Sequence, residues 1–220
     1  MSRISLPHST TDIHDRFQYE RFLYKQGFSA IAGSDEVGRG PLAGPVVAAS
    51  VILPAECDRS PFLDSKQLSH TRLVLAYDYL HELGCPVGIG VVSTETIERI
   101  NILQASLLAM KRSINDLERQ GHRPDYILVD GKFEIPLSLP QQALIKGESK
   151  SSSIAAASIA AKVTRDRIMV EMDKKFPLYN FAQHKGYPTK AHKQAVREFG
   201  PCKIHRKTFK GVKEFVTKSS

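Results

Sequence analysis

The most informative part of the chain is residues 29–47, which have the sequence Ser-Ala-Ile-Ala-Gly-Ser-Asp-Glu-Val-Gly-Arg-Gly-Pro-Leu-Ala-Gly-Pro-Val-Val. A short apolar run ends in two adjacent carboxylates, Asp35 and Glu36, and a second apolar run, rich in β-branched residues, follows at residues 46–53. This pattern predicts two strands joined by a glycine-lined turn, with both acids at the end of the first strand.

The residue types around this turn indicate chemistry on phosphate esters. Two acids at a strand end can hold a hard divalent cation through their oxygens. Gly38 and Gly40 let the backbone approach a ligand closely, and Arg39 between them suits a phosphate oxyanion. An ordinary hairpin with solvated acids remains an alternative for this stretch taken alone. The glycine spacing matches neither the dinucleotide-binding fingerprint nor an ATPase phosphate loop.

The composition indicates a globular protein with a polyanionic partner. The chain has 220 residues, of which 41% are hydrophobic, enough to bury the core of one large domain. All of the net charge of +8 lies in residues 185–218, which contain 10 Lys and Arg against 2 Asp and Glu. Because Tyr187, Phe199 and Phe209 interrupt this segment, we expect it to fold and to present a basic surface to nucleic acid.

The cysteines and the apolar runs predict a cytoplasmic protein without a membrane anchor. Only 3 cysteines occur, with no C-x-x-C motif, which is typical of a reducing compartment. No apolar run reaches the ~20 residues of a membrane span, and the first residues lack the apolar core of a signal peptide. Cys202 with His205, and His81 with Cys85, lack the further ligands of a tetrahedral zinc site.

The rest of the chain mixes patterns typical of helices and of strands. We expect helices over residues 12–27, 71–83, 102–120 and 153–175, and strands over residues 86–92, 126–130 and 143–148. Within the third of these helices the apolar stripe is Leu103, Leu107, Met110, Ile114 and Leu117. The mixture predicts an α/β layer architecture with a helical C-terminal part.

Four carboxylates each follow an apolar strand-like run: Asp35, Glu36, Asp130 and Glu148. In an open sheet, acids at strand ends converge at one edge, where ligands bind. Four carboxylates are enough to hold two hard cations about 4 Å apart, the arrangement used for in-line attack on a phosphodiester. Their mutual repulsion would be tolerated only with metal bound.

Asp166 competes with Glu148 for the fourth place. If the helix between them is continuous, 18 residues at a rise of ~1.5 Å separate the two by nearly 27 Å, so both cannot serve one ion pair. Asp166 is flanked by two arginines and follows Lys162 by one helical turn, so a helix-surface ion pair explains it. Glu148 lies just before a helix N-terminus, whose positive end also suits a phosphate, and it is therefore preferred.

The motifs between residues 29 and 210, taken in order, resemble those of ribonuclease HII. They are Asp35-Glu-Val-Gly-Arg-Gly-Pro-Leu-Ala-Gly-Pro45, Asp64-Ser-Lys66, Val129-Asp-Gly131, Lys146-Gly-Glu148, Ser153-Ile-Ala-Ala-Ala-Ser-Ile159, Ala161-Lys-Val-Thr-Arg-Asp166, Gly186-Tyr-Pro-Thr-Lys-Ala-His192 and His205-Arg206. One position departs from the family: Glu148 stands where Asp is usual, and its extra methylene moves the charge outward.

The resemblance implies a fold and an activity. The fold would be RNase H-like, with a mixed central sheet flanked by helices in residues 1–180 and a small, basic, helical, substrate-binding extension in residues 181–220. The activity would be endonucleolytic cleavage of the RNA strand of RNA–DNA hybrids, and of single ribonucleotides embedded in duplex DNA. Two Mg²⁺ or Mn²⁺ ions would be required, and the ends would be 5′-phosphate and 3′-hydroxyl. A monomer is expected.

The resemblance also implies roles for the substrate-binding residues. Gly38, Arg39 and Gly40 match a loop whose backbone reads the ribose 2′-hydroxyl. Tyr187 matches a tyrosine that stacks at the junction of RNA and DNA, although a tyrosine before a proline can also simply anchor a turn.

Phosphate contacts are expected from the remaining basic positions. The resemblance implies them for Lys66, Lys190 and Arg206, although surface lysines are usually just solvated. The basic surroundings of His184, His192 and His205 favour the same role over that of ligands or general bases.

Two other functions remain open on the sequence. A non-catalytic RNA-binding protein would use the basic C-terminal surface and show no metal-dependent cleavage. A nuclease or integrase of related architecture would act on DNA alone. A DNA duplex with one ribonucleotide, tested with and without Mn²⁺, separates all three possibilities.

Overall fold

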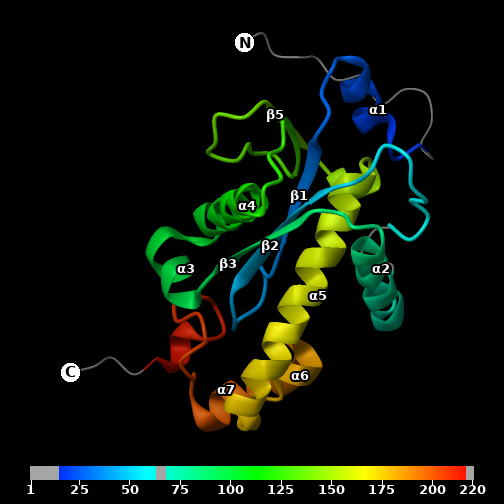
Figure 1. The fold of residues 1–220 in the computed structure, drawn as a ribbon. Helices are drawn as coiled ribbons and strands as arrows, with labels where there is room; N and C mark the ends of the chain where they lie inside the picture. The colour runs from blue at the N-terminus through cyan, green and yellow to red at the C-terminus, as the bar shows by residue number, and fades with distance from the viewer. Residues whose placement is uncertain (1–14, 63–67, 217–220) are drawn as a thin grey trace.

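A five-stranded mixed sheet forms the centre of the protein in a computed structural model that describes residues 15–62 and 68–216 (Figure 1). Its strands are β1 (Ile31–Val37), β2 (Val46–Ile52), β3 (Val87–Val92), β4 (Tyr126–Asp130) and β5 (Gln141–Leu144), in the order β3-β2-β1-β4-β5. β1 pairs antiparallel with β2 and parallel with β4. β2 and β3 are antiparallel, and β4 and β5 are parallel. The predicted α/β fold with a mixed central sheet is confirmed.

Two long helices cover the two faces of the sheet, α4 (Ile102–Arg119) and α5 (Ser152–Lys175) (Figure 1). Alternate residues of β2 explain why, because a strand points successive side chains to opposite faces. Val46 and Ala48 are buried in the cluster that contains the apolar residues of α4. Ala49 and Val51 are buried with the alanines of α5. β2 is apolar on both faces, so it needs a helix on each.

The remaining helices surround this core. They are α1 (Gln18–Lys25), α2 (His70–Glu82), α3 (Thr94–Ile100), α6 (Phe181–His184) and α7 (Lys190–Phe199), with 3-10 turns at Gly147–Ser149, Pro177–Tyr179 and Lys213–Phe215. α2 packs beside α5, and α6 and α7 follow at the C-terminal end of α5 (Figure 1). Within residues 15–62 and 68–216, none of these helices is long and apolar enough to cross a membrane.

Most of the predicted elements are present, with three differences. The first predicted helix is shorter, since α1 covers Gln18–Lys25 and residues 12–14 lie outside the described part. The strand predicted over residues 143–148 ends at Leu144, because Lys146 adopts a left-handed conformation with φ of 57°. The third difference is α3, which was not predicted; Ser93 caps it by accepting from the Thr96 N–H.

The apolar stripe of α4 is only partly as predicted. Met110, Ile114 and Leu117 are buried, whereas Leu103 and Leu107 are only partly covered. Alanines and serines of the helix take up the rest of its buried face, so α4 lies closer to the sheet than a leucine stripe would allow.

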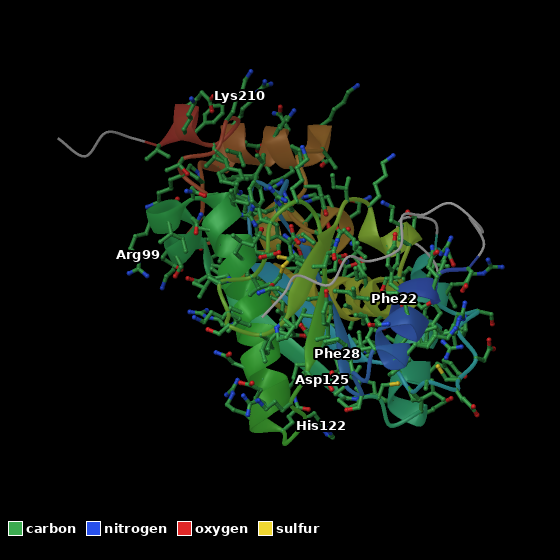
Figure 2. All side chains as sticks on the ribbon, turned by 90° about the horizontal axis from the view of Figure 1, so that it is seen from above. Phe22, Phe28, Arg99, His122, Asp125 and Lys210 are labelled. Carbon is green, nitrogen blue, oxygen red and sulfur yellow. The ribbon has the colours of Figure 1, made fainter. Side chains whose placement is uncertain are left out.

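The starts of β1 and β4 are tied together at the end of the molecule opposite the C-terminal segment. Asp125 accepts hydrogen bonds from the backbone N–H of Ser29 (2.7 Å) and Ala30 (3.0 Å). Figure 2 shows Asp125 beside Phe28 at one end and Lys210 at the other. Asp125 therefore lies at the strand starts and is separate from the acids at the strand ends.

Gly33 allows α5 to lie directly against β1. A Cβ at this position would lie 2.1 Å from the carbonyl carbon of Ser153, in the first turn of α5. No side chain fits there, because the obstacle is backbone that cannot rotate away. The approach fixes the N-terminus of α5, and with it the turn that carries Glu148, relative to the end of β1.

Replacing Gly33 by alanine should therefore destabilise the fold. Overpacking against backbone is expected to cost about 3 kcal/mol, seen as a lower midpoint in thermal and urea unfolding. Gly40→Ala is the matched control, since a Cβ at Gly40 meets nothing within 4 Å. Equal midpoints for the two variants would contradict the close packing of α5 on β1.

Candidate active site

The register of β1 and β4 places two acids side by side. In this parallel pair Ser34 lies opposite Val129, the residues directly before Asp35 and Asp130. Parallel strands end at the same edge, so both acids stand at one rim of the sheet, as predicted. Asp35 is only 4% exposed, although it is a carboxylate.

Glu148 is brought to the same rim by a tight turn. The left-handed conformation of Lys146 redirects the chain after β5, and Gly147 and Glu148 begin a 3-10 turn. The N–H of Gly147 donates to Oδ1 of Asp130 at 2.6 Å. This bond anchors the turn to β4, and Glu148, at 6% exposure, is buried beside it.

The four carboxylates interact electrostatically. Burial raises the pKa of Asp35 well above its usual range, and repulsion from Glu36, Asp130 and Glu148 raises it further. Burial also raises the pKa of Glu36 to about 7, with Arg39 opposing the shift and Asp130 adding to it. A hydrogen bond from the Ser158 hydroxyl partly stabilises the Asp35 carboxylate. Like charges in one buried place favour the binding of a cation.

The chemistry of this donor set fits a hard divalent cation. Asp35, Glu36, Asp130 and Glu148 offer only carboxylate oxygens, which suit Mg²⁺ and Mn²⁺. Across residues 15–62 and 68–216, no three His, Cys, Asp or Glu side chains lie as close together as the ligands of one metal ion. Glu36, Asp130 and Glu148 are nevertheless near enough to Asp35 for their charges to raise its pKa.

Asp166 forms the ion pair that its sequence context predicts. Its carboxylate lies 2.8 Å from Nζ of Lys162 along α5. Ser158, which contacts Asp35, lies eight residues earlier on the same helix, and eight residues of helix span about 12 Å. The ion pair with Lys162 on the same helix therefore explains Asp166.

The glycine-lined turn between β1 and β2 lies beside the carboxylates. Arg39 is exposed, and its Nη1 lies 3.2 Å from Oε1 of Glu36. Gly38 has a φ of +99°, and a Cβ on it would lie 2.7 Å from the carbonyl oxygen of Pro45, so only glycine fits. Gly40 faces open space. The turn thus joins the acidic rim to a surface with room for a ligand.

Arg206 differs from the phosphate contact expected from the sequence. Its side chain is fully buried beneath the turn and donates to the carbonyl oxygens of Gly38, Arg39 and Gly44. Arg165 of α5, which the sequence did not single out, lies in a similar position and donates to the carbonyl of Ala43 at 3.1 Å. The sequence feature that could have identified Arg165 is its occurrence within an otherwise Ala-rich buried helix.

Two of the other expected substrate contacts are exposed. Tyr187 is 38% exposed, with the guanidinium of Arg165 at 5.7 Å and Nζ of Lys162 at 5.9 Å from its ring centre. Lys190 is exposed at the start of α7. Lys66 lies outside the described residues.

The three histidines of the basic segment are buried, which overturns their expected role as phosphate contacts. The N–H of Cys202 donates to Nδ1 of His205 (2.9 Å), so His205 carries its proton on Nε2. That proton is donated to Nε2 of His192 (3.0 Å), and Nδ1 of His192 donates to the carbonyl of Tyr187 (2.9 Å). Burial lowers the pKa of both rings to about 4. His184 stacks on His192, and burial lowers its pKa as well.

Comparison with solved structures identifies the fold. The structure of the PCNA:RNase HII complex from Archaeoglobus fulgidus matches with a TM-score of 0.68 and 24% identity, covering 83% of this chain and 96% of that one. Bst-RNase HIII in complex with Mn²⁺ matches with a TM-score of 0.67 and 20% identity, covering 84% of this chain and 68% of that one. The fold, with carboxylates at its strand ends, is that of the ribonuclease H class.

Sequence comparison identifies the family. The profile described as Ribonuclease HII matches residues 32–212. The Ribonuclease HII of Desulfotalea psychrophila is 58% identical over 202 residues, which cover 92% of this chain and 90% of that protein. The Ribonuclease HII of Geobacter metallireducens is 51% identical over 207 residues, covering 93% and 96%. The chain belongs to the ribonuclease HII family and is a metal-dependent hydrolase of the ribonuclease H type.

Without metal, the protein should lose stability as the pH rises. Glu36 has a pKa of about 7 in the folded protein against an ordinary 4.5, so the folded state holds more protons than the unfolded state between these values. Stability therefore falls with rising pH in that window, and the loss is complete above it. In urea titrations with EDTA, we expect the free energy of unfolding to decrease by more than about 1.4 kcal/mol, the equivalent of one pKa unit, between about pH 5 and about pH 8.

Two comparisons check that the carboxylates cause this loss. Glu36→Gln removes one carboxyl group of the site with a raised pKa, while Asp35 remains as another, and should reduce the pH dependence. Saturating Mg²⁺ or Mn²⁺ should restore stability at the higher pH, since a bound cation offsets the repulsion. A pH dependence that is unchanged in Glu36→Gln would contradict this assignment.

Proposed function

We propose that this protein cleaves the RNA strand of RNA–DNA hybrids and also cuts at single ribonucleotides embedded in duplex DNA. The family provides ribonuclease H endonuclease activity on hybrids. The observation that carries the finer proposal is the contact between Arg39 and Glu36. This contact sets a glycine-lined backbone, able to approach a sugar closely, directly beside the acidic rim.

Asp35, Glu36, Asp130 and Glu148 would together hold two divalent ions, Mg²⁺ or Mn²⁺. When bound, such a pair supplies the Lewis acidity that favours attack by water and departure of the 3′ oxygen, leaving a 5′-phosphate and a 3′-hydroxyl. Glu148 is longer than the Asp usual in the family, and the turn tied to Asp130 through Gly147 supports its place in this set.

The protein's own groups would orient the catalytic carboxylates and contact the substrate. The backbone N–H of Glu36 donates to Oδ1 of Asp35 at 2.7 Å, and a hydrogen bond from the Ser158 hydroxyl also stabilises this carboxylate. Arg39, now paired with Glu36, can turn towards a substrate phosphate once a cation neutralises that acid. The backbone of Gly38, Arg39 and Gly40 would contact the 2′-hydroxyl, the group that distinguishes RNA from DNA.

The basic C-terminal part would bind the duplex. In this proposal residues 1–180 form the catalytic domain and residues 181–220 the substrate-binding extension. Tyr187 would stack at the junction of RNA and DNA, and Lys190 and Lys66 would contact phosphates. We propose a monomer that acts in the cytoplasm, consistent with three free cysteines at Cys57, Cys85 and Cys202.

Asp35→Asn should abolish cleavage while leaving binding largely intact. The substrate is a DNA duplex with one ribonucleotide, tested with Mn²⁺ and without metal. We expect cleavage activity to fall at least about 100-fold, because mutation of residues that only orient metal ligands already reduces activity 10–100-fold. Asp78→Asn, an exposed acid on α2, is the control. Full activity of Asp35→Asn would end the proposal, and cleavage of an all-DNA duplex by the unaltered protein would favour a DNA nuclease.

Tyr187→Ala should mainly impair cleavage at isolated ribonucleotides. A single ribonucleotide always presents a junction with DNA, whereas most sites in a uniform hybrid do not, and stacking contributes about 1–3 kcal/mol per base. The measurement is the ratio of kcat/KM on the two substrates. Phe199→Ala, another exposed aromatic residue of the basic segment, is the control. An equal loss on both substrates would argue against the stacking role.

A further inference from the structure

Two buried arginines lie beneath the turn formed by residues 38–45 and make six hydrogen bonds to its carbonyl oxygens. Arg206 donates from Nε and Nη2 to Gly44 (3.1 and 2.9 Å), from Nη1 to Arg39 (2.9 Å) and from Nη2 to Gly38. Arg165 donates from Nε to Pro45 (3.0 Å) and from Nη2 to Ala43 (3.1 Å). The conformation of the turn is therefore determined largely by side chains that come from α5 and from the C-terminal segment.

Carbonyl oxygens are the hydrogen-bond partners of both guanidiniums. Each is buried, and neither forms a salt bridge with a carboxylate in the described parts of the chain. Burial lowers the pKa of Arg206 to about 9, and the neighbouring Arg165 contributes to the shift. Two cations under one backbone segment give that segment a positive electrostatic potential, which favours an oxygen ligand on its outer side.

The inward carbonyls dictate where the backbone N–H groups point. In a trans peptide the C=O of one residue and the N–H of the next point in opposite directions, and the structure has no cis peptides among its described residues. Because the carbonyls of Gly38 and Arg39 face Arg206, the N–H groups of Arg39 and Gly40 face away from it.

These two N–H groups differ from those of Leu42 and Gly44 in the same turn. The N–H of Leu42 donates to the carbonyl of Gly186 (2.8 Å), and that of Gly44 to the carbonyl of Ile204 (2.9 Å). For the N–H groups of Arg39 and Gly40, the described residues provide no backbone acceptor. Gly40 also faces open space, so a ligand oxygen can reach both donors.

We infer that Arg165 and Arg206 are positioning residues that hold the N–H groups of Arg39 and Gly40 towards the substrate and thereby set the preference for ribose over deoxyribose. The inference rests on the proposed function, in which this turn contacts the 2′-hydroxyl. It assigns to the two arginines a role in selectivity, exerted through the backbone and without contact to the nucleic acid.

Substitution by lysine separates the shape of the guanidinium from its charge. Lysine keeps the positive charge, but its compact ammonium cannot reach the carbonyls of Gly38, Arg39 and Gly44 in the fixed geometry of a planar fork. A residue that served only as a charge would tolerate the exchange, whereas a residue that shapes the turn would not.

The experiment compares binding in an Asp35→Asn background, which suppresses cleavage. The ligands are a DNA duplex with one ribonucleotide and the all-DNA duplex of the same sequence. Adding Arg206→Lys should reduce the preference for the ribonucleotide duplex at least about tenfold, with little change for the all-DNA duplex, because a hydrogen bond to a charged group is worth that much. Arg197→Lys, at an exposed position of α7, is the control and should keep the preference.

A second variant keeps the test decisive if Arg206→Lys does not fold. Arg165→Lys should reduce the preference in the same way, through Ala43 and Pro45. In Arg206→Ala, guanidinium chloride at millimolar concentration should restore part of the preference for the ribonucleotide duplex, since free guanidinium can occupy the vacated site. An equal concentration of NaCl should not restore it.

The outcomes distinguish the inference from the function on which it rests. An unaltered preference in both lysine variants overturns the inference, and so does an equal loss of affinity for the two duplexes. If the unaltered protein does not cleave at the ribonucleotide and Asp35→Asn shows no preference, the proposed function itself fails. Loss of preference in the lysine variants, with retained preference in Arg197→Lys, supports the inference.

Discussion

The direct contact of α5 with β1 is the constraint on which the rest of the site depends. Because Gly33 has no side chain, the first turn of α5 lies on the strand backbone, and the turn before it carries Glu148 to the strand end. From this start the helix passes Ser158 beside Asp35 and, two turns further on, Arg165 beneath the glycine-lined turn. One straight element therefore sets the spacing between the acids and the proposed substrate-binding backbone, and a shift of the helix would displace both together.

Two opposite electrostatic environments lie next to each other at the rim of the sheet. The buried carboxylates repel one another, whereas two buried guanidiniums beneath the neighbouring turn donate their hydrogen bonds to carbonyl oxygens. Arg39 connects the two regions through its contact with Glu36. Such an arrangement suits a ligand that brings cations to one side and sugar and phosphate oxygens to the other, which is the character of a nucleic-acid backbone with its counterions. The stability lost to the buried charges is offset by the packing of α4 and α5 on the sheet.

The sequence predicts the acidic part of the site better than the basic part, for physical reasons. Strand-end acids can be predicted because the end of an apolar run can be recognised from the sequence alone. Parallel pairing of the strands then brings Asp35 and Asp130 together. Arg206 and the histidines were expected at the surface, since basic residues in a basic segment are usually solvated. The burial of Arg206 depends on backbone partners more than 160 positions away, such as the carbonyl of Gly38, and such partners cannot be recognised from a local pattern. The histidines are instead buried against one another and against nearby backbone, such as the carbonyl of Tyr187. The position of Glu148 required a left-handed residue, Lys146, that propensities do not anticipate.

The long reach of Arg206 has a consequence for the order in which the protein matures. The acceptor at Gly38 is synthesised 168 residues before its donor, and chains emerge from the ribosome N-terminal end first. The strand-end acids of β1 and β4 can therefore assemble in a nascent chain while the turn beside them still lacks its support. A chain that stops short of Arg206, through early termination or proteolysis, would carry the hydrolytic groups with only Arg165 of the two arginines proposed to set the preference for ribose. Because the second arginine comes last, substrate discrimination is coupled to completion of the polypeptide.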